Sequence, residues 1–381
     1  MTKKSIHFFV RTLNQEKGGG SHHNAISFIN FLKDKGHDVV VHTLVSVGNN
    51  VPQGMALVEH QGERYGFLAA QNFLVSLLRQ YEKNVDVYFL YGVDFSWGGG
   101  KYRREGGLTP VVVYLDTYLA SMNLGEGEGR LYYLKRILWD KIVGLRYVQW
   151  VDRFLAVSPF LQEQYIRAGF PVGSFMVVPN FFKFPNTKPT HHNMPDTLRL
   201  LYTGRLIYDK GVDLLIRAVA RLPSYPWTLT IVGDGPMKEI LIRLAEALGI
   251  SSRVTFLPWL DMAALDLEYS RADIFVHPAR WPEPFGRTVV EVMAHGVPTI
   301  VPRNGGAAWI VDNTGILFNN NDLDSLCSAL SRLVEDPILR SSLGEAAYKR
   351  AQVFSEEAVG TLLIEAIALQ KSPQSKKAAT F

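Results

Sequence analysis

The chain has 381 residues, of which 47% are hydrophobic and 20% are charged, and this composition excludes a disordered protein. The length predicts two or three domains of ordinary size. The formal net charge of +4 is compatible with an anionic ligand or a membrane surface, and we expect no nucleic-acid partner. The single cysteine, Cys327, excludes an internal disulfide and suits a reducing compartment.

The first apolar segment, Ile6–Val10, is followed by Arg11 and is too short for the core of a signal peptide. It is better interpreted as a buried strand. No apolar segment approaches the roughly 20 residues that a membrane-spanning helix needs. We therefore expect a cytoplasmic protein.

Short β-branched or aromatic segments alternate with helical patterns along the whole chain. The predicted strands are, in the first half, 5–10, 39–44, 85–90, 111–115 and 154–157, and, in the second half, 198–202, 228–232, 254–257, 274–277 and 299–301. Such alternation is typical of parallel sheets with helical crossovers. Two sets of about five strands therefore predict an α/β protein with two doubly wound, Rossmann-like domains.

A segment with three prolines and little periodicity separates the two sets of strands, which is typical of a linker. We expect an N-terminal domain over 1–181, a linker over 182–197 and a C-terminal domain over 198–354. A last amphipathic helix over 355–370 is predicted to cross back to the N-terminal domain. A polar tail follows over 371–381.

Two glutamates eight positions apart, Glu283 and Glu291, lie on either side of a predicted turn. Pro284 and Gly286 favour the turn, and the glycine allows close approach of the backbone to a ligand. Thr288 is the predicted N-cap of the helix that carries Glu291. Amides at a helix N-terminus attract anions such as phosphate, so carboxylates beside them are suited to hold sugar hydroxyls. The alternative is a surface loop with two solvated glutamates.

Two basic residues, Arg205 and Lys210, follow the first strand of the second half, where ligands of open α/β sheets bind. Arginine matches phosphate oxygens with a planar fork, and lysine acts as a point charge, so the pair predicts a phosphate site. A solvated pair of loop residues is the alternative. The next strand ends in a glycine turn, Gly233–Pro236, at the same edge.

Three glycines, Gly18, Gly19 and Gly20, follow the first strand of the chain and lead into a helix. They let the backbone approach a ligand and direct amides towards it. The segment is neither a Walker motif, because no Gly-Lys-Ser/Thr sequence closes it, nor the G-x-G-x-x-G dinucleotide motif. A flexible turn without a ligand is the alternative.

Taken together, these motifs resemble those of the retaining glycosyltransferases of family four, which have the GT-B fold. The resemblance extends over nearly the whole chain in the same order, and the two-glutamate element is its most specific part. The segments that carry it are Phe154–Ser158, Val178–Asn180, Gly204–Gly211, Val232–Pro236, Glu283–Glu291 and Ala294–Pro298. It implies two doubly wound domains with an interdomain cleft.

The resemblance also implies roles for the matching residues. Glu291 corresponds to the glutamate that binds the nucleotide ribose, and Glu283 to the one that contacts hydroxyls of the donor sugar. Arg205 and Lys210 correspond to the pair that neutralises the diphosphate leaving group. The other residues that the resemblance assigns to donor binding are Gly18, Gly19, Gly20, Gly204, Gly233, Phe285 and Gly286.

The implied reaction transfers a sugar from a UDP- or GDP-sugar to an acceptor hydroxyl with retention of configuration. Fixed cations would stabilise the charge that develops on the leaving phosphate, so we expect no metal and no other cofactor. The adjacent pairs His22–His23 and His191–His192 do not chelate a metal readily, because neighbouring side chains diverge. Attack on the face of the leaving phosphate is implied by the resemblance alone, and a covalent mechanism stays open.

The chain departs from the family pattern at several positions. Leu115 precedes Asp116 where a histidine is common, and Asp116 is the predicted contact to the sugar or acceptor. Trp309 stands where glutamate is common, and Pro258 stands where glycine is usual, before Trp259. These departures bear on specificity for base and sugar more than on the chemistry.

The segment 131–150 has the pattern of a helix with an aliphatic face and interleaved basic and aromatic residues. Such content is typical of a helix at a membrane surface, and the basic and aromatic residues of 97–104 add a second contact. The alternative is a helix that buries its aliphatic face in the first domain and exposes its cations.

We therefore expect an enzyme that uses a nucleotide-sugar donor and a glycan or lipid-linked acceptor, with peripheral contact to the inner face of the membrane. A soluble transferase that makes a small glycoside or sugar phosphate is one alternative. A catalytically inactive subunit that binds a nucleotide sugar is another. A nucleotide-sugar epimerase fits less well, because the Glu283 and Glu291 element is typical of transferases.

Overall fold

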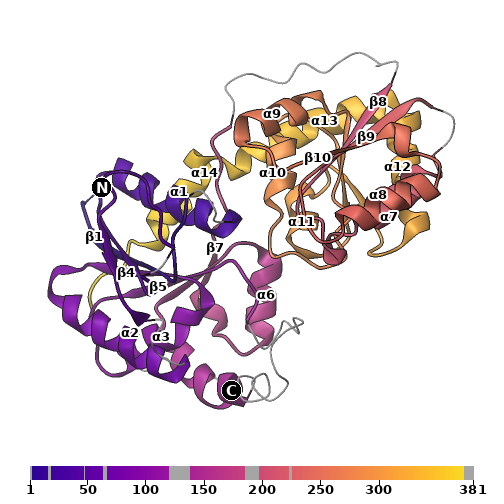
Figure 1. Ribbon diagram of the computed structural model, residues 1–381. Coiled ribbons are helices and arrows are strands. Elements are labelled where there is room, and N and C mark those ends of the chain that lie inside the picture. The colour runs from indigo at the N-terminus through magenta and orange to yellow at the C-terminus, as the bar shows by residue number, and fades with distance from the viewer. Residues whose placement is uncertain are drawn as a thin grey trace. The chain divides into compact units, whose positions relative to one another are not determined.

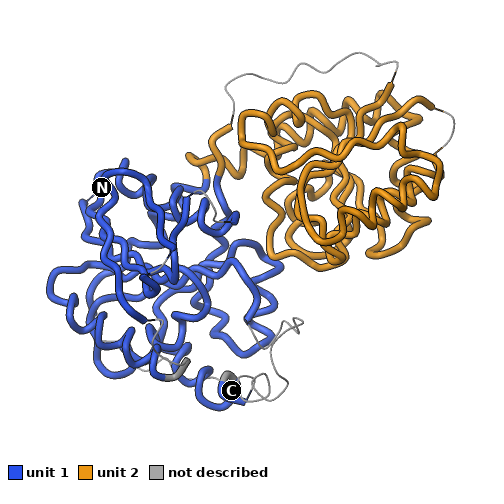
Figure 2. Tube along the Cα trace, viewed as in Figure 1, with its two compact units in different colours: residues 1–181, 359–381 blue, residues 182–358 orange. Residues whose placement is uncertain are grey.

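The computed structural model describes residues 2–15, 19–46, 48–62, 67–119, 138–184, 197–222 and 225–372. The chain forms two compact units (Figure 2): Met1–Phe181 with Val359–Phe381 make up unit 1, and Phe182–Ala358 make up unit 2. In each unit the strands lie inside and helices pack around them (Figure 1). Gly18, the first part of the predicted basic helix, and most of the predicted linker and tail lie outside the described residues.

Unit 1 contains a seven-stranded parallel sheet in the order β3-β2-β1-β4-β5-β6-β7. Its strands are β1 (Ser5–Val10), β2 (Asp38–Thr43), β3 (Leu57–Glu59), β4 (Val87–Tyr91), β5 (Val111–Leu115), β6 (Arg153–Ala156) and β7 (Phe175–Val177). Its helices are α1 (Gly20–Asp34), α2 (Phe67–Tyr81), α3 (Ser96–Arg104), a π-helical turn (Asp140–Gly144), α5 (Leu145–Val148), α6 (Pro159–Arg167) and most of α14 (Glu356–Ala366).

Unit 2 contains a six-stranded parallel sheet in the order β10-β9-β8-β11-β12-β13. Its strands are β8 (Leu198–Thr203), β9 (Trp227–Val232), β10 (Val254–Leu257), β11 (Ile274–Val276), β12 (Thr299–Pro302) and β13 (Ile316–Phe318). Its helices are α7 (Val212–Val219), α8 (Lys238–Ala247), α9 (Met262–Arg271), α10 (Arg287–Met293), α11 (Gly305–Val311), α12 (Leu323–Glu335) and α13 (Pro337–Ala351).

Both sheets reverse their strand order at one point. In unit 1 the chain builds outward from β1 to β3 on one side and from β4 to β7 on the other, and unit 2 repeats this with β8 to β10 and β11 to β13. In open α/β sheets a ligand crevice lies at the carboxyl ends of the strands at such a topological switch point. The loops after β1 and β4 in unit 1, and after β8 and β11 in unit 2, are therefore the expected ligand sites.

The predicted α/β, doubly wound class is confirmed, and each of the ten predicted strands is present with ends that differ by at most two residues. Strands β4 and β5 are buried at every position, because helices cover parallel sheets on both faces. The strands that the sequence does not predict are β3, β7 and β13. Each has three residues and lies at an outer edge, so it is too short to show a period.

The C-terminal residues that the structure describes, up to 372, pack on unit 1. Helix α14 ends at Ala366, four residues before the predicted end. Arg153 Nη1 donates to the carbonyls of Glu365 (2.7 Å) and Ala366 (3.1 Å), and Lys4 Nζ donates to the carbonyl of Leu369 (2.6 Å). Cations at the C-terminal end of a helix satisfy its free carbonyls and favour its dipole. These contacts fasten the end of α14 to strands of unit 1.

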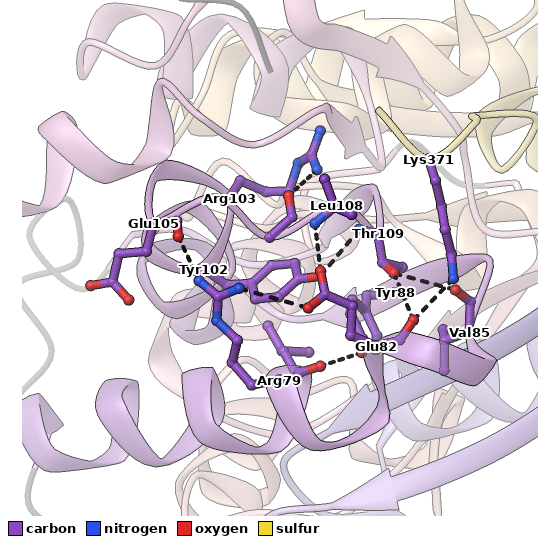
Figure 3. A network of polar contacts seen from close by, with 12 residues as sticks. Arg79, Glu82, Val85, Tyr88, Tyr102, Arg103, Glu105, Leu108, Thr109 and Lys371 are labelled. Atoms are coloured by element: carbon purple, nitrogen blue, oxygen red, sulfur yellow. Dashed lines mark hydrogen bonds and ion pairs between the residues drawn. The ribbon is translucent and has the colours of Figure 1, made fainter. Parts of the chain in front are cut away.

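A polar network beside the starts of β4 and β5 holds the residues after α14 (Figure 3). The carboxylate of Glu82 accepts a hydrogen bond from Tyr102 Oη (2.6 Å), and the Glu82 carbonyl accepts one from Lys371 Nζ (2.9 Å). Arg103, whose side chain is fully buried, pairs with Asp152 at 2.8 Å. A buried pair of this kind is costly to break, because the remaining charge is left without its partner.

The described part of the predicted basic helix, 138–150, does not bury its aliphatic face. Leu138 and Ile142 are exposed, whereas Trp139 packs edge-on against the buried Trp97, with ring centroids 5.3 Å apart. The alternative in which the aliphatic face is buried is therefore wrong at Leu138 and Ile142, where an indole is packed inward instead. Within the described residues, no helix is long and apolar enough to cross a membrane.

Three histidines from neighbouring strands form a hydrogen-bonded chain inside unit 1. His42 Nε2 lies 2.8 Å from His7 Nδ1, and His42 Nδ1 lies 3.0 Å from His60 Nε2. The rings of His42 and Phe9 stack with centroids 4.4 Å apart. Because the two contacts use different nitrogens of His42, the side chains do not converge on one point. Among the residues described, no group of His, Cys, Asp and Glu could hold a metal ion.

Candidate active site

A polar cluster of one buried and two partly buried side chains lies in unit 2, where β8 and β11 are neighbours at the switch point. Lys210, in the short turn after β8, places Nζ 2.5 Å from Oε1 of Glu283. His277, directly after β11, places Nε2 3.2 Å from the same oxygen. The exposed fractions of the Lys210, Glu283 and His277 side chains are 21%, 17% and 4%. The fold thus joins residues that are 73 positions apart in the sequence.

The charges around Glu283 keep its carboxylate ionised. Burial by itself acts to raise the pKa of Glu283, but His277 and Lys210 lower it by more. The net pKa therefore lies well below that of an ordinary glutamate. Burial, reinforced by the charge of Glu283, raises the pKa of Tyr202 on β8. A buried carboxylate that stays ionised is a strong acceptor for hydroxyl groups.

Glu291 lies on α10 and is held from two sides. Its Oε2 accepts a hydrogen bond from Tyr269 Oη at 3.0 Å, and its Oε1 lies 3.4 Å from Nη2 of Arg287, one turn earlier in the helix. Tyr269 is fully buried. Burial, reinforced by the charge of Glu291, raises the pKa of Tyr269, so its hydroxyl remains a donor.

The start of α10 differs from the prediction. The helix begins at Arg287 with Gly286 as its N-cap, and no side chain caps it, so the prediction of Thr288 as N-cap is wrong. Gly286 has a φ of 130°, which a residue with a side chain rarely adopts. The turn is therefore closed by the backbone of a glycine and not by a hydroxyl group.

Trp309, which stands where the family often has glutamate, supports this turn. Its ring lies 6.3 Å from that of Phe285 and 5.4 Å from that of Phe354, between centroids. Phe285 itself is buried and contacts Phe354 edge-on at 5.8 Å. The tryptophan thus joins an aromatic cluster behind the turn.

The loop that carries Glu283 rests on two glycines at the start of α11. The amide of Gly306 donates to the carbonyl of Glu283 at 2.7 Å. A Cβ at Gly305 would lie 2.8 Å from the Glu283 carbonyl oxygen, and a Cβ at Gly306 would lie 2.3 Å from that of Pro284. Glycine is required where two backbones approach this closely. The position of Glu283 therefore depends on this glycine pair.

Substitution of Gly305 by alanine is expected to lower the free energy of unfolding by about 2–4 kcal/mol, because φ is +70° and the new Cβ would meet backbone atoms. Gly249→Ala is the matched control: φ is also +70°, but nothing lies within 4 Å. It should cost about 1 kcal/mol, the strain of the left-handed backbone alone. Urea unfolding measures both losses. Equal losses would contradict the importance of the close approach.

Arg205 is exposed directly after β8 and makes no ion pair within the described part of the chain, so its guanidinium is open to an anion. Its neighbour Gly204 contacts Gly233 at the end of the adjacent strand. A Cβ at Gly233, whose φ is +143°, would lie 2.0 Å from the Gly204 carbonyl oxygen. This close approach explains the glycine at 233 without a ligand.

In unit 1, Asp116 follows β5 and accepts a hydrogen bond from Ser21 Oγ in the first turn of α1. Burial raises the pKa of Asp116, against the opposing effects of this bond and of the charge of His22. Tyr91, at the end of β4, donates to the Ser21 carbonyl at 3.1 Å. A carboxyl group with a raised pKa exchanges a proton more easily near neutral pH than an ordinary aspartate does.

Of the predicted glycine loop, Gly19 is the N-cap of α1 and Gly20 is its first residue. Gly19 has an ordinary φ of −74°, and a Cβ there would meet nothing within 4 Å. The backbone therefore does not require glycine at 19, and the open space beside it is compatible with a ligand. Gly18 lies outside the described residues.

The sequence does not single out His277 or Tyr269 as site residues. His277 could be found from its position, because it directly follows the buried strand Ile274–Val276 at the carboxyl edge of the sheet. Tyr269 carries no comparable signal. It lies near the C-terminal end of α9, and the fold alone brings it to Glu291.

Comparison with known proteins matches residues 184–350 to the family described as "Glycosyl transferases group 1". Lipopolysaccharide core biosynthesis glycosyltransferase LpsE of Rhizobium meliloti (strain 1021) is 34% identical over 169 residues, which are 43% of this chain and 48% of that protein. The GDP-mannose-dependent alpha-(1-6)-phosphatidylinositol monomannoside mannosyltransferase of Mycolicibacterium smegmatis is 36% identical over 153 residues, or 38% and 40% of the two chains. The chain spans about half the length, or less, of these curated relatives.

Solved structures resemble the chain over nearly its full length. Sucrose-phosphate synthase from Thermosynechococcus elongatus has a TM-score of 0.76 at 21% identity, covering 95% of this chain and 98% of that one. Anabaena Alr3699/HepE in complex with UDP and glucose has a TM-score of 0.72 at 20% identity, covering 96% and 99%. At such identities the likeness shows the fold alone. Residues 184–350 are therefore similar to the group 1 glycosyl transferases, and the chain has the GT-B fold.

Proposed function

We propose that the chain is a retaining glycosyltransferase that moves a sugar from a nucleotide-diphosphate donor, a UDP- or GDP-sugar, to an acceptor hydroxyl. The observation that carries the proposal is the largely buried cluster of Lys210, Glu283 and His277 at the switch point of unit 2. The family match covers this unit. The names of the relatives, which include lipopolysaccharide core and phosphatidylinositol mannoside glycosyltransferases, support a role in glycan, polysaccharide or glycolipid assembly.

The leaving diphosphate is the group whose charge increases most in the transition state, and fixed donors aimed at it lower the barrier. In the proposal, Arg205 binds it through its exposed guanidinium. Lys210 directs one N–H at Glu283 and has two more for phosphate oxygens. The amides of Phe285 and Gly286 before α10 add further donors.

The two carboxylates are proposed to bind the hydroxyls of the donor sugar and of the ribose. Glu283 accepts hydrogen bonds from hydroxyls of the sugar, and Glu291 accepts them from the ribose. Tyr269 and Arg287 fix the Glu291 side chain, so little ordering is needed when the nucleotide binds.

We propose attack on the same face as the leaving phosphate. The acceptor oxygen forms a bond to the anomeric carbon as the bond to the phosphate oxygen breaks, and the hydroxyl proton passes to the phosphate. Asp116 contacts the sugar or acceptor in this proposal. Because Arg205 and Lys210 supply two positive charges, the reaction is proposed to need no divalent metal.

The direct test is a thermal-shift screen with UDP, GDP, ADP, CMP and TDP and their sugar conjugates, with and without magnesium. A ligand at about 100 times its dissociation constant adds roughly 2.7 kcal/mol of stability, which shifts the midpoint visibly. Stabilisation by one diphosphate without magnesium supports the proposal and identifies the base. No response to any of these ligands would contradict the proposed nucleotide-sugar site.

Trp259 is proposed to stack on the nucleobase. It is 71% exposed and follows β10, whose Leu257 carbonyl accepts a hydrogen bond from Gly233 at the end of β9 (3.1 Å). We expect Trp259→Ala to weaken binding of the UDP or GDP selected by the screen roughly tenfold, because base–aromatic stacking contributes about 1–3 kcal/mol. Trp259→Phe should keep most of the affinity. Isothermal titration would exclude the role if the alanine variant bound as well as the wild type.

For the acceptor we propose a lipid-linked glycan and peripheral contact with a membrane. In unit 1, the exposed Leu138 and Ile142 lie next to the exposed Lys141 and Arg146 in the sequence. Apolar and basic side chains together favour an anionic lipid surface. Flotation with anionic liposomes at low salt tests this contact, and a protein that stays in the soluble fraction would favour the soluble-transferase alternative.

A further inference from the structure

Within the described residues, the hydrogen bonds and ion pairs of the Glu283 side chain all involve one of its two oxygens. Lys210 Nζ and His277 Nε2 lie 2.5 Å and 3.2 Å from Oε1. Oε2 has no such partner in that part of the chain. The carboxylate therefore has one oxygen bound to protein groups and one available to a ligand. His277 has no role in the mechanism proposed so far.

We propose that His277 is a positioning residue for Glu283. It holds Oε1 in place while Lys210 binds the diphosphate, so that Oε2 can accept a hydrogen bond from a hydroxyl of the donor sugar. The inference rests on the proposed function, in which Lys210 contacts the leaving phosphate. Lysine is a mobile point charge on a flexible stem, so phosphate oxygens compete with Glu283 for it. A carboxylate held by Lys210 alone would be held less firmly once the other N–H groups of this ammonium bind phosphate oxygens.

The environment of His277 suits a constant anchor. The side chain is 4% exposed, and neither ring nitrogen has a hydrogen-bond partner of good geometry among the described residues, so the 3.2 Å contact from Nε2 to Glu283 is an ion-pair distance. A buried imidazole without other partners gains most by directing an N–H at the nearest anion, and both the neutral Nε2–H tautomer and the imidazolium can do so. Its position directly after β11, before Pro278, fixes the backbone from which it reaches Glu283.

The other titratable groups around the cluster do not replace His277. Burial, reinforced by the charge of Glu283, raises the pKa of Tyr202 on β8, so this hydroxyl stays neutral in acid and at neutral pH. Arg205, in the loop after β8, is exposed and acts on Tyr202 through its charge. Lys210 and His277 are the groups that act directly on Glu283.

The first test follows the ionisation of Glu283 without any substrate. Glutamate is labelled with ¹³C at Cδ, and the Glu283 resonance is identified by its absence in Glu283→Gln. In the wild type it should stay that of an ionised carboxylate down to the lowest pH at which the protein is folded. In His277→Leu, which has a similar volume but no N–H, the carboxyl should titrate at a pH about one unit higher or more. In His277→Gln, whose amide reaches as far as Nε2, most of the wild-type behaviour should return.

The second test measures turnover with the nucleotide sugar selected by the screen of UDP-, GDP- and ADP-sugars. His277→Leu should lower kcat about tenfold to a hundredfold, because a misplaced reacting group costs rate and not ground-state binding. The KM for the donor and the affinity for the free diphosphate should change much less. His277→Gln should recover most of kcat.

If His277→Leu does not fold, His277→Asn takes its place, because its shorter amide falls short of Oε1 and should behave like the leucine variant. An unchanged Glu283 titration in these variants would overturn the inference, and so would a glutamine variant as impaired as the leucine variant. A wild-type protein that turns over no nucleotide sugar would refute the proposed function alone, since the titration needs no substrate.

Discussion

Replacement of Glu283 by glutamine is expected to lower kcat for sugar transfer about a hundred- to a thousandfold, while the affinity for the nucleoside diphosphate changes less than about tenfold. Glutamine keeps the size of the side chain but removes the negative charge between Lys210 and His277. Hydrogen bonds to an ionised acceptor are roughly twice as strong as neutral ones, and the proposed bond to the donor sugar is lost or weakened.

Glu291→Gln is the matched control, because it makes the same chemical change in the same motif, at a carboxylate held by Tyr269 and Arg287. It should weaken binding of UDP or GDP about tenfold and have a smaller effect on kcat. Steady-state kinetics and isothermal titration separate the two effects. If both variants lost kcat and affinity to the same extent, the assignment of sugar to Glu283 and ribose to Glu291 would be wrong.

The fold could be predicted because the buried strands can be recognised in the sequence as apolar segments. Strands such as Val111–Leu115 are continuous apolar segments, since helices cover them on both faces. The three-residue edge strands carry no period, and their pairing depends on neighbours that are distant in the chain.

The site could be predicted only in part. Motifs locate Glu283 and Lys210, but the contact between them arises because β8 and β11 are adjacent, which no local pattern encodes. The same holds for Tyr269, which reaches Glu291 from another helix. The glycine at 305 is explained by a neighbouring backbone, which its local sequence does not reveal. Motifs therefore locate residues of the site, whereas tertiary packing determines which of their atoms are in contact.

The free energy of unfolding is expected to fall steeply as the pH drops from about 6.5 towards 4. The hydrogen-bonded chain of His7, His42 and His60 in unit 1 is a main cause of this loss. Burial lowers the pKa of His7 to about 4, against the opposing charge of Asp38. Burial, reinforced by the charges of His7 and His60, lowers the pKa of His42 to about 3. Each contact between two ring nitrogens needs one hydrogen and one lone pair, so the fully protonated rings cannot keep these contacts.

The direction of this pH effect follows from the number of protons that the folded and unfolded states bind. An unfolded histidine has a pKa of about 6.5, so between that pH and the folded pKa the unfolded state binds more protons and stability rises with pH. The stabilisation is therefore present above about pH 6.5 and is lost in acid. At about 1.4 kcal/mol for each unit of pKa, His7 and His42 should each account for roughly 3 kcal/mol between neutral pH and pH 4, or about 6 kcal/mol together. Burial raises the pKa of the neighbouring Tyr88, so this residue contributes packing and no charge in this range.

The variant His42→Phe tests the contribution of the three-histidine chain separately from that of the other histidines, because its ring can still stack on Phe9. At neutral pH the variant should be less stable by about 1–3 kcal/mol, since His7 and His60 lose a hydrogen-bond partner. Its dependence on pH should be flatter by about 1 kcal/mol per unit, so the two stability curves converge in acid. Urea unfolding between pH 7 and about 4.5 measures both slopes, with His23→Gln, an exposed position of α1, as the control. Parallel curves for wild type and His42→Phe would show that the acid sensitivity arises elsewhere, because removal of a group that binds no extra proton on unfolding leaves the slope unchanged.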